Sequence, residues 1–376
     1  MKKTTAHALP QPLPRRGIYR ILVCRPNHRL GNTILLTPLI QELEQLYPGA
    51  EIDVLAEGDI AEEVFSHFFS IKNVFCLPRR GFKHPVAFLS LLHSVRQTYY
   101  DLIIDPCLGS GFSRAMTLHM RGRFTLGFSD DRRGSGLTHA VPTDVAGKHM
   151  ARRAIHLVRW ACTEHTGQVQ ASASYPSLDI RLSSEERVQG LAALRQVLDE
   201  GERAADHPVV GIFANATGAK RYSSEWWAQF IQSFKSNCAA SSIVELIPAH
   251  GHSMLGETCG GYYSSDIRRM GAVMANVDLM ISADCGVMHL AVASKVPTVG
   301  LFSVTDASVY APYGSGCCSL LTTGRSPQDA ASQVVLSFAS ILGSPRQGGS
   351  RRDAPSNELG AGAHRQSHFD QLGLSI

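Results

Sequence analysis

The sequence contains no apolar run near the 18 or so residues that a membrane-spanning helix requires. Its first 17 residues begin with lysines but lack the continuous apolar stretch of a secretory signal peptide. Charged residues are also few, at 18% of the 376 residues, whereas hydrophobic residues make up 44%. This is the composition of a soluble globular protein, and we expect it to stay in the cytoplasm.

The cysteines form no CxxC pair and no zinc-ligand spacing. Reduced thiols in a cytosolic protein are the simplest interpretation of such scattered cysteines. His250 and His252 are disfavoured as a metal pair, because no carboxylate or cysteine follows at a useful spacing. We therefore expect no metal and no cofactor. The nine cysteines stand at positions 24, 76, 107, 162, 238, 259, 285, 317 and 318.

The net charge of +4 comes from the ends of the chain. Residues 1–20 carry five basic and no acidic residues, and residues 343–376 carry four basic and three acidic residues. The ends therefore sum to +6, which leaves the middle of the chain near −2. This argues against a nucleic-acid partner, although local basic patches are present.

Apolar strand-like runs alternate with helical spacing twice along the chain, which predicts an α/β fold with two Rossmann-like parallel-sheet domains. Among the expected helices are residues 32–47, 149–165, 224–238 and 328–342. The predicted divisions are a disordered leader (1–17), an N-terminal domain (18–170), an interdomain passage (171–207), a C-terminal domain (208–342) and a disordered tail (343–376).

The most informative stretch is residues 277–314. An apolar run ends in a polar turn at 282–286, and a short helix and a second buried strand follow. A helix that begins near Gly286 directs unpaired N–H groups at whatever lies above the strand, as anion sites do. Asp284 adds a carboxylate and His289 lies on the side that could face a ligand. A plain turn with a packed histidine is the alternative.

Two further loops each follow the first predicted strand of a domain. Residues 25–32 contain one glycine and no G-x-G-x-x-G, which disfavours a nicotinamide enzyme, and residues 214–222 do not fit a P-loop. Lys220 in the second loop suits a diphosphate, and a solvated Lys-Arg pair is the alternative. Core packing is the simplest interpretation of Trp226 and Trp227. Ser265 precedes a helix, and capping by Ser or Asp is favoured there.

The stretch 277–314 resembles the signature of glycosyltransferase family nine, the lipopolysaccharide heptosyltransferases. Two positions depart from the signature, Cys285 for Thr and Ser303 for Gly, and both replacements are small. The residues that match are Asp284, Gly286, His289, Ala291, Ala293, Pro297, Thr298, Leu301, Phe302, Thr305, Pro312 and Gly314.

Leu30-Gly31-Asn32 and Thr37-Pro38 resemble the N-terminal motif of the family, where an Asp is held to be the general base. Asn32 replaces that Asp and cannot accept a proton at neutral pH. His28 is a candidate base, and Asp105 at a strand end is another. Loss of catalysis is a further alternative, which would leave a nucleotide-sugar-binding protein; a sugar epimerase of related fold is a third.

The resemblance implies a GT-B fold, with ligands bound in a cleft between the two domains, and an inverting, metal-independent transferase. The implied donor is a nucleotide sugar, ADP-heptose by family precedent, and the implied acceptor is a lipid-linked saccharide of the lipopolysaccharide core at the cytoplasmic membrane leaflet. The candidate catalytic residues are Asn32, His28 and Lys220. The donor-binding candidates are Thr217, Gly218, Lys220, Ser265, Asp284, Cys285, Gly286 and His289, and the acceptor-binding candidates are Gly31, Arg79 and Arg121.

Overall fold

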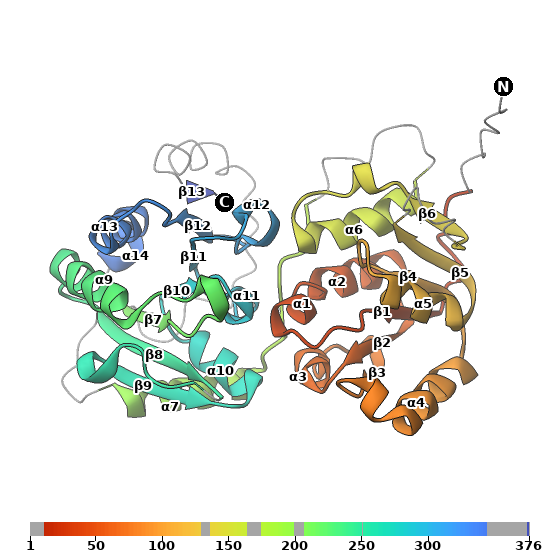
Figure 1. The fold of residues 1–376 in the computed structure, drawn as a ribbon, viewed down its shortest axis with the longest axis horizontal. Helices are drawn as coiled ribbons and strands as arrows, with labels where there is room; N and C mark the ends of the chain where they lie inside the picture. The colour runs from red at the N-terminus through yellow and green to blue at the C-terminus, as the bar shows by residue number, and fades with distance from the viewer. Residues whose placement is uncertain are drawn as a thin grey trace. The chain divides into compact units, whose positions relative to one another are not determined.

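The computed structural model describes residues 11–128, 136–163, 174–198, 207–249 and 251–343, together with the backbone of residues 374 and 375. The chain divides into two compact units, Met1–Pro176 and Ser177–Ile376. Each unit is built on a mainly parallel sheet with helices on both faces (Figure 1). The α/β fold predicted from the sequence is confirmed.

The sheet of unit 1 has the strand order β3-β2-β1-β4-β5-β6, and all its pairs are parallel. The chain builds outward from β1 to β3 and then crosses back to β4. The carboxyl ends of β1 and β4 therefore form the point where the winding reverses, which is where open α/β sheets bind ligands. The strands are β1 (Arg20–Cys24), β2 (Glu51–Glu57), β3 (Ile71–Leu77), β4 (Tyr99–Asp105), β5 (Arg121–Phe128) and β6 (His139–Val141).

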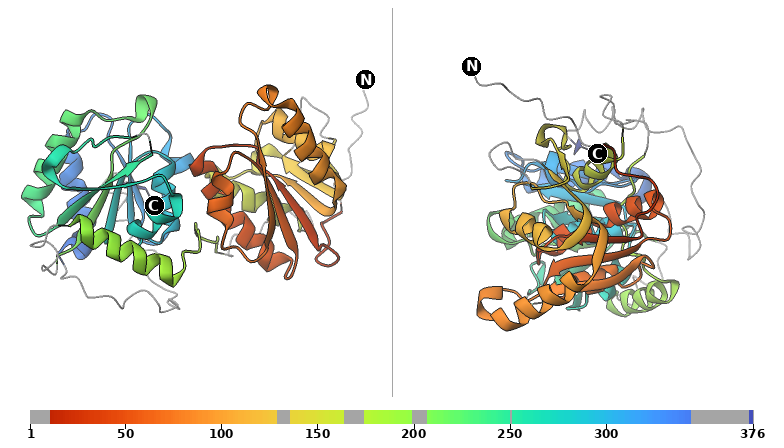
Figure 2. Two further views of the ribbon diagram at one scale, coloured as in Figure 1. Left: turned by 90° about the horizontal axis from the view of Figure 1, so that it is seen from below. Right: turned by 90° about the vertical axis from the view of Figure 1, so that its right-hand side faces the viewer.

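Helices cover both faces of this sheet (Figure 2). Phe88 of α4 stacks on Phe112 of α5 with ring centroids 6.3 Å apart, so these two helices lie side by side. On the opposite face, α2 packs against α6. The helices are α1 (Leu30–Ile34), α2 (Thr37–Leu46), α3 (Ile60–Phe65), α4 (Pro85–Gln97), α5 (Gly111–His119) and α6 (Met150–Ala161).

The single helix predicted over residues 32–47 is wrong, because the structure has α1 and α2 in its place. Pro38 has no N–H to donate to the carbonyl of Ile34, so the helical ladder cannot continue. The Thr37 hydroxyl donates to that carbonyl instead, at 2.8 Å. The proline therefore starts a new helix rather than extending the first.

The sheet of unit 2 has the order β13-β12-β11-β10-β7-β8-β9, parallel except for the short β13. The short strands β9 and β12 were not predicted from the sequence. All five residues of β7, β10 and β11 are buried, as expected for central strands of a parallel sheet. The strands are β7 (Val209–Phe213), β8 (Ser242–Pro248), β9 (Gly260–Ser264), β10 (Leu279–Ala283), β11 (Thr298–Phe302), β12 (Cys318–Leu321) and β13 (Leu374–Ser375).

On one face of this sheet α9 packs against α13, and on the other α10 packs against α7. Part of the predicted interdomain passage is thus α7 of unit 2, and it begins with a capping box of Ser183 and Glu186. The helix predicted over 328–342 is in two pieces, because Phe338 has φ −117° and ψ 22°. The helices are α7 (Ser184–Val197), α9 (Ser224–Asn237), α10 (Ile267–Met274), α11 (Gly286–Ala293), α12 (Ala307–Tyr310), α13 (Pro327–Ser337) and α14 (Ala339–Leu342).

Residues 11–17 of the predicted leader are ordered against unit 1. Leu13 is buried, and its N–H donates to the carbonyl of Ala161 at 2.8 Å. None of the nine cysteines, all of which the structure describes, is in a disulfide. Within the described ranges, every helix is too short or too polar to span a bilayer.

Candidate donor site and acceptor loops

The carboxyl end of β10 leads directly into α11, as the sequence of residues 277–314 predicted. Asp284 follows the strand and is 4% exposed, and its N–H donates to the carbonyl of Leu301 on the neighbouring β11. Cys285 is the N-cap residue in an extended conformation, with φ −159° and ψ 177°. The helix therefore begins at Gly286, immediately beside the Asp284 carboxylate.

Lys220 reaches this position from the loop after β7, the strand next to β10. Its Nζ lies 2.7 Å from Oδ2 of Asp284. The ammonium also lies 5.8 Å from the centroid of the Tyr310 ring, within the range of a cation–π contact. The Lys220 side chain is 36% exposed and that of Asp284 is 5% exposed. The pair thus presents an accessible cation anchored to a buried carboxylate.

The amino end of α11 is not capped by a side chain. The Cys285 side chain makes no capping hydrogen bond. Burial raises the pKa of its thiol, whereas the N–H of Met288, the Ser282 hydroxyl and the N–H of Val287 lower it by favouring negative charge at the sulfur. N–H groups that favour a thiolate also favour an oxyanion placed near them. This is the electrostatic property that a diphosphate site requires.

Thr217 and Gly218 belong to the same loop as Lys220. Both are exposed, and Gly218 has a positive φ of 63° that lets the chain turn into the single 3-10 turn Gly218–Lys220. His289 lies in α11 and is 3% exposed. The structure therefore brings Thr217, Gly218, Lys220, Asp284, Cys285 and Gly286 together around two adjacent strand ends, with His289 buried behind them.

Ser265 lies apart from this group. It follows β9, the edge strand, and is exposed. Three strand spacings separate β9 from β10, or about 14 Å at the usual ~4.8 Å between strands. The cap of α10 is Asp266, whose carboxylate accepts from the Arg269 N–H at 2.9 Å, so capping by the Asp is confirmed.

Trp226 and Trp227 belong to the core, as predicted. Trp227 is completely buried and both rings pack against Phe230.

Sequence reasoning missed Glu245, a buried carboxylate that accepts from the Ser253 hydroxyl at 2.6 Å and from the Met254 N–H at 2.8 Å. It fixes the loop after β8, which neighbours β7. Tyr310 was missed as well, and neither residue stands in a pattern that marks its role.

In unit 1 the loop after β1 holds three of the predicted residues. His28 is half exposed and its Nδ1 lies 3.1 Å from Oε2 of Glu57, at the end of β2. The Asn32 side-chain N–H₂ donates to Oδ1 of Asn27 at 3.0 Å, and the same oxygen accepts from the N–H of Arg29. Gly31 is buried in α1. The loop is thus organised by Asn27, which sequence reasoning did not single out.

The alternative base Asp105 is not accessible. It is 0% exposed, its Oδ2 accepts from Nε of Arg114 at 3.0 Å, and its Oδ1 accepts from the Ser113 hydroxyl at 2.6 Å. The carboxylate is therefore a structural anchor between β4 and α5. Of the two candidate general bases predicted from the sequence, His28 is therefore the exposed one.

The predicted acceptor arginines lie at opposite ends of the sheet. Arg79 follows β3 at the carboxyl end, and its guanidinium is 3.9 Å from Asp59. Arg121 is the first residue of β5 and pairs with Tyr99, the first residue of β4, so it lies at the amino end of the sheet. The structure does not bring Arg121 together with Gly31 and Asn32, which follow the carboxyl end of β1.

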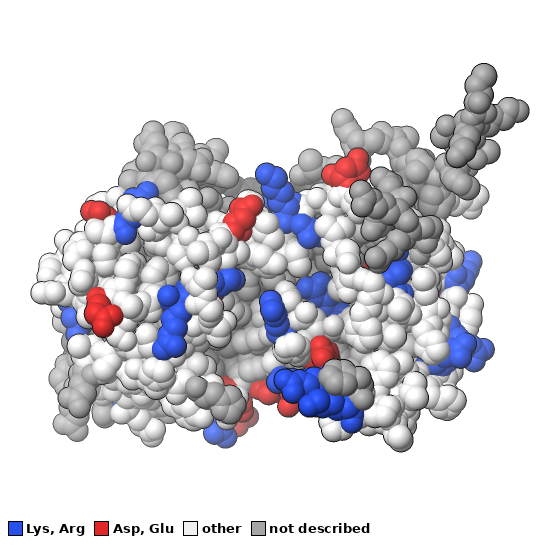
Figure 3. All heavy atoms as spheres, viewed as in Figure 1, with Lys and Arg blue, Asp and Glu red and all other residues white. Residues whose placement is uncertain are grey.

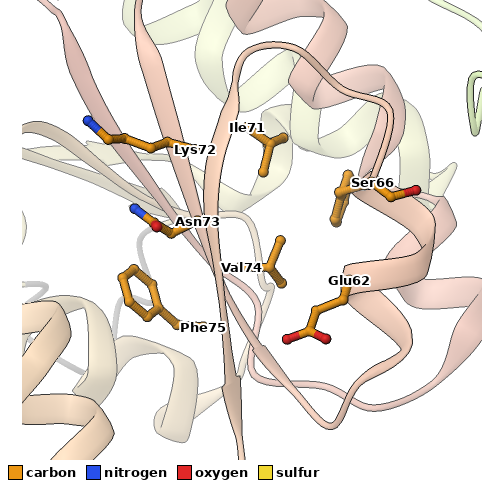
Figure 4. A pocket seen from close by; sticks show the side chains of 8 residues that line it. Glu62, Ser66, Ile71, Lys72, Asn73, Val74 and Phe75 are labelled. Carbon is orange, nitrogen blue, oxygen red and sulfur yellow. The ribbon is translucent and has the colours of Figure 1, made fainter.

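A hollow in the surface of unit 1 lies between α3 and β3. Glu62 and Ser66 face Ile71 and Val74 across it (Figure 4). It contains none of the predicted site residues.

In the described part of the chain no three His, Cys, Asp or Glu side chains gather as metal ligands would, and His250 of the disfavoured metal pair lies outside the described residues.

Two parallel-sheet α/β units are the architecture of the glycosyltransferases called GT-B, and the fold of this chain matches solved structures of that class. A family model described as glycosyltransferase family 9 (heptosyltransferase) matches residues 88–334. The chain belongs to this family and is a glycosyltransferase. The matched range includes Lys220 and Asp284 but not Asn32. A comparison with curated protein sequences gives no match.

Solved structures support the fold. A family 9 glycosyltransferase from Veillonella parvula superposes with a TM-score of 0.70 at 17% identity, over 86% of this chain and 97% of that one. The E. coli heptosyltransferase WaaC with ADP gives 0.62 at 17% identity, over 86% and 99%. E. coli ADP-heptose heptosyltransferase II gives 0.64 at 19% identity, over 86% and 98%. Similarity at this level establishes the fold.

Proposed function

We propose that the protein transfers a sugar from a nucleoside-diphosphate donor, by family precedent a heptose from ADP-heptose, onto a saccharide of the lipopolysaccharide core or a related surface glycan. The observation that carries this proposal is the Lys220–Asp284 pair beside the uncapped amino end of α11. One of the similar structures was solved with ADP and another with a fluorinated ADP-heptose. Those ligands have the diphosphate that this site is suited to hold.

The expected reaction is a single displacement. An acceptor hydroxyl attacks the anomeric carbon, the bond to the diphosphate breaks, and the leaving nucleoside diphosphate takes the bonding electrons. Lys220 and the N–H groups at the start of α11 stabilise the negative charge that develops on it. Asp284 holds the ammonium in place, so little reorganisation is needed at the moment of bond cleavage. We expect no metal in this step.

The proton of the acceptor hydroxyl goes to His28 in this scheme. The Nδ1 edge of His28 faces Glu57, which leaves Nε2 to accept a proton. Asn32 orients the hydroxyl instead of deprotonating it: its N–H₂ group is held by Asn27, and its carbonyl oxygen can accept a hydrogen bond.

Transfer from ADP-heptose to a lipopolysaccharide-core acceptor tests the proposal, with release of ADP as the readout. We expect turnover by the parent, a higher rate for Asn32→Asp, and a rate about 100-fold lower for His28→Gln, at the low end of what general base catalysis contributes. Val188→Ser, on the exposed side of α7, is the matched control for a surface change. Donor binding without transfer or hydrolysis in both the parent and Asn32→Asp would refute the enzymatic proposal.

The second candidate function is binding of a nucleotide sugar without turnover. It is favoured by one observation, the Asn32 amide whose hydrogen bond to Asn27 makes it part of the loop scaffold rather than a proton acceptor. Under this alternative, donor binding persists and Asn32→Asp restores no activity. A rate for the parent above that of the uncatalysed reaction would exclude it.

We also propose that unit 1 rests on the cytoplasmic membrane leaflet through α4. Val86 and Leu89 are 80% and 63% exposed on this helix. Residues 78–100 carry four Arg or Lys and no acidic residue, and Lys and Arg gather near α3 and the start of α4 (Figure 3). Exposed apolar side chains with basic residues around them suit an anionic lipid surface, where the acceptor would be anchored.

A further inference from the structure

Arg25 is an unusual residue in the structure. It follows the last residue of β1 and is only 8% exposed. Its Nη1 lies 3.5 Å from the sulfur of Cys107, and its Nε is buried with no hydrogen-bond partner among the described residues. A guanidinium is charged at all ordinary pH values, so its burial carries a desolvation cost that a partner normally offsets.

The carboxylates at the carboxyl ends of β2 and β4 have other partners. Asp105 pairs with Arg114, Glu57 faces His28, and Asp59 lies near Arg79. Within the described ranges Arg25 makes no ion pair of its own. The carboxyl end of this sheet therefore holds one buried positive charge that the described residues do not neutralise with an ion pair.

The amino end of α5 lies beside this charge. The Ser113 hydroxyl in its first turn donates to the carbonyl of Cys24, the residue before Arg25. The Ser110 side chain caps the N–H of Ser113, and within the described residues the N–H groups of Gly111 and Phe112 have no hydrogen-bond acceptor. The loop before the helix is open, since no atom lies within 4 Å of the position of a β-carbon on Gly109.

We propose that Arg25 and the first turn of α5 form an oxyanion site, which holds a carboxylate or phosphate group of the acceptor saccharide. The planar guanidinium suits two-point binding of either group, and the helix dipole adds favourable potential. The site lies where the sheet of unit 1 reverses its winding, between β1 and β4. Only the identification of the ligand as acceptor rests on the proposed function; the anion site stands on the geometry.

Three matched hexoses test the site: glucose 6-phosphate, glucuronate and glucose, each added to the full chain at constant ionic strength. We expect an anionic hexose at about ten times its Kd to raise the Tm of the parent by about 3–6 °C, and glucose to leave it unchanged. A response to glucose 6-phosphate alone assigns the site to phosphate, and a response to glucuronate alone assigns it to carboxylate. No response of the parent to either anionic hexose would overturn the proposal.

Two variants separate ligand binding from a structural role. Arg25→Met keeps the apolar stem and should abolish the response, whereas Arg20→Gln, an exposed arginine at the other end of the same strand, should retain it. Without ligand, Arg25→Met should unfold at the same temperature as the parent or higher, because a buried charge is removed. A Tm several degrees lower, or a retained response, would contradict the proposal.

Titration with ADP keeps this result apart from the proposed function. Arg25→Met should bind ADP as the parent does, because the proposed donor residues belong to unit 2. If no variant binds ADP, the donor proposal fails while the response to anionic hexoses still decides the role of Arg25.

Discussion

Breaking the Lys220–Asp284 pair should destabilise unit 2 in a way that depends on which partner is removed. In Lys220→Met the carboxylate of Asp284, 5% exposed, loses its cation. Removing one partner of a fully buried pair costs about 3–5 kcal/mol. Lys220 is 36% exposed, so solvent already screens the pair. We expect a loss of about 2 kcal/mol, which for a unit of this size lowers Tm by about 4–8 °C.

The second partner gives the matched measurement. In Asp284→Asn the lysine can turn to solvent, so the loss should stay below about 1 kcal/mol. Adding Lys220→Met to Asp284→Asn should then cost no more than about 0.5 kcal/mol, because no buried charge is left without a partner. Additive losses of both single variants, or a parent-like Lys220→Met, would show that the two groups do not interact.

Tryptophan fluorescence can follow this unfolding in unit 2 alone. Of the three tryptophans, Trp226 and Trp227 lie in α9 of unit 2 and Trp160 lies in α6 of unit 1. A Trp160→Phe background therefore leaves a signal from unit 2 only, and urea titration of the four variants in that background yields the coupling free energy of the pair.

Three further predictions follow from the structure. Cys285→Thr should change the Kd for ADP less than threefold, because the backbone N–H groups at the start of α11 stay in place; a tenfold loss in a titration would assign a role to the thiol. Burial lowers the pKa of His156, and the charges of Arg159 and Arg152 lower it further. The neutral imidazole therefore stabilises the fold above the unfolded pKa of about 6.5, and this contribution falls as the pH drops below that value. The Tm of His156→Gln should fall less between pH 7.5 and 5.5 than the Tm of the parent, and equal losses would contradict this. The double variant Val86→Ser/Leu89→Ser should sediment less with vesicles of anionic lipid than the parent or Val188→Ser, and equal sedimentation would remove α4 as a membrane contact.

Much of the fold could be predicted because the central strands are continuous apolar runs. Strands β7, β10 and β11 are buried at every position, so their composition marks them without reference to neighbours. The short strands β9 and β12 lack this signal: β9 begins with two glycines and alternates in burial at the sheet edge. Its pairing with β8 is a tertiary effect that local sequence does not encode.

The candidate site was predictable where a motif is contiguous. Asp284, Cys285 and Gly286 are neighbours in sequence, and Lys220 follows the strand that pairs with β10. The ion pair of Lys220 with Asp284 depends on side-chain direction, which spacing does not reveal. Arg25 and Asp105 show the limit more clearly. Arg25 follows β1 and Asp105 ends β4 in the same sheet. Asp105 pairs with Arg114, whereas Arg25 has no carboxylate partner among the described residues, and only packing decides this difference.

In the proposed donor site, Lys220 and the start of α11 hold the diphosphate. Titration calorimetry with ADP can measure this binding for the parent, Lys220→Met, and Lys235→Met as a control at an exposed lysine in α9 of the same unit. We predict an ADP affinity at least tenfold lower for Lys220→Met and unchanged for Lys235→Met. Equal ADP affinity for Lys220→Met and the parent would contradict it.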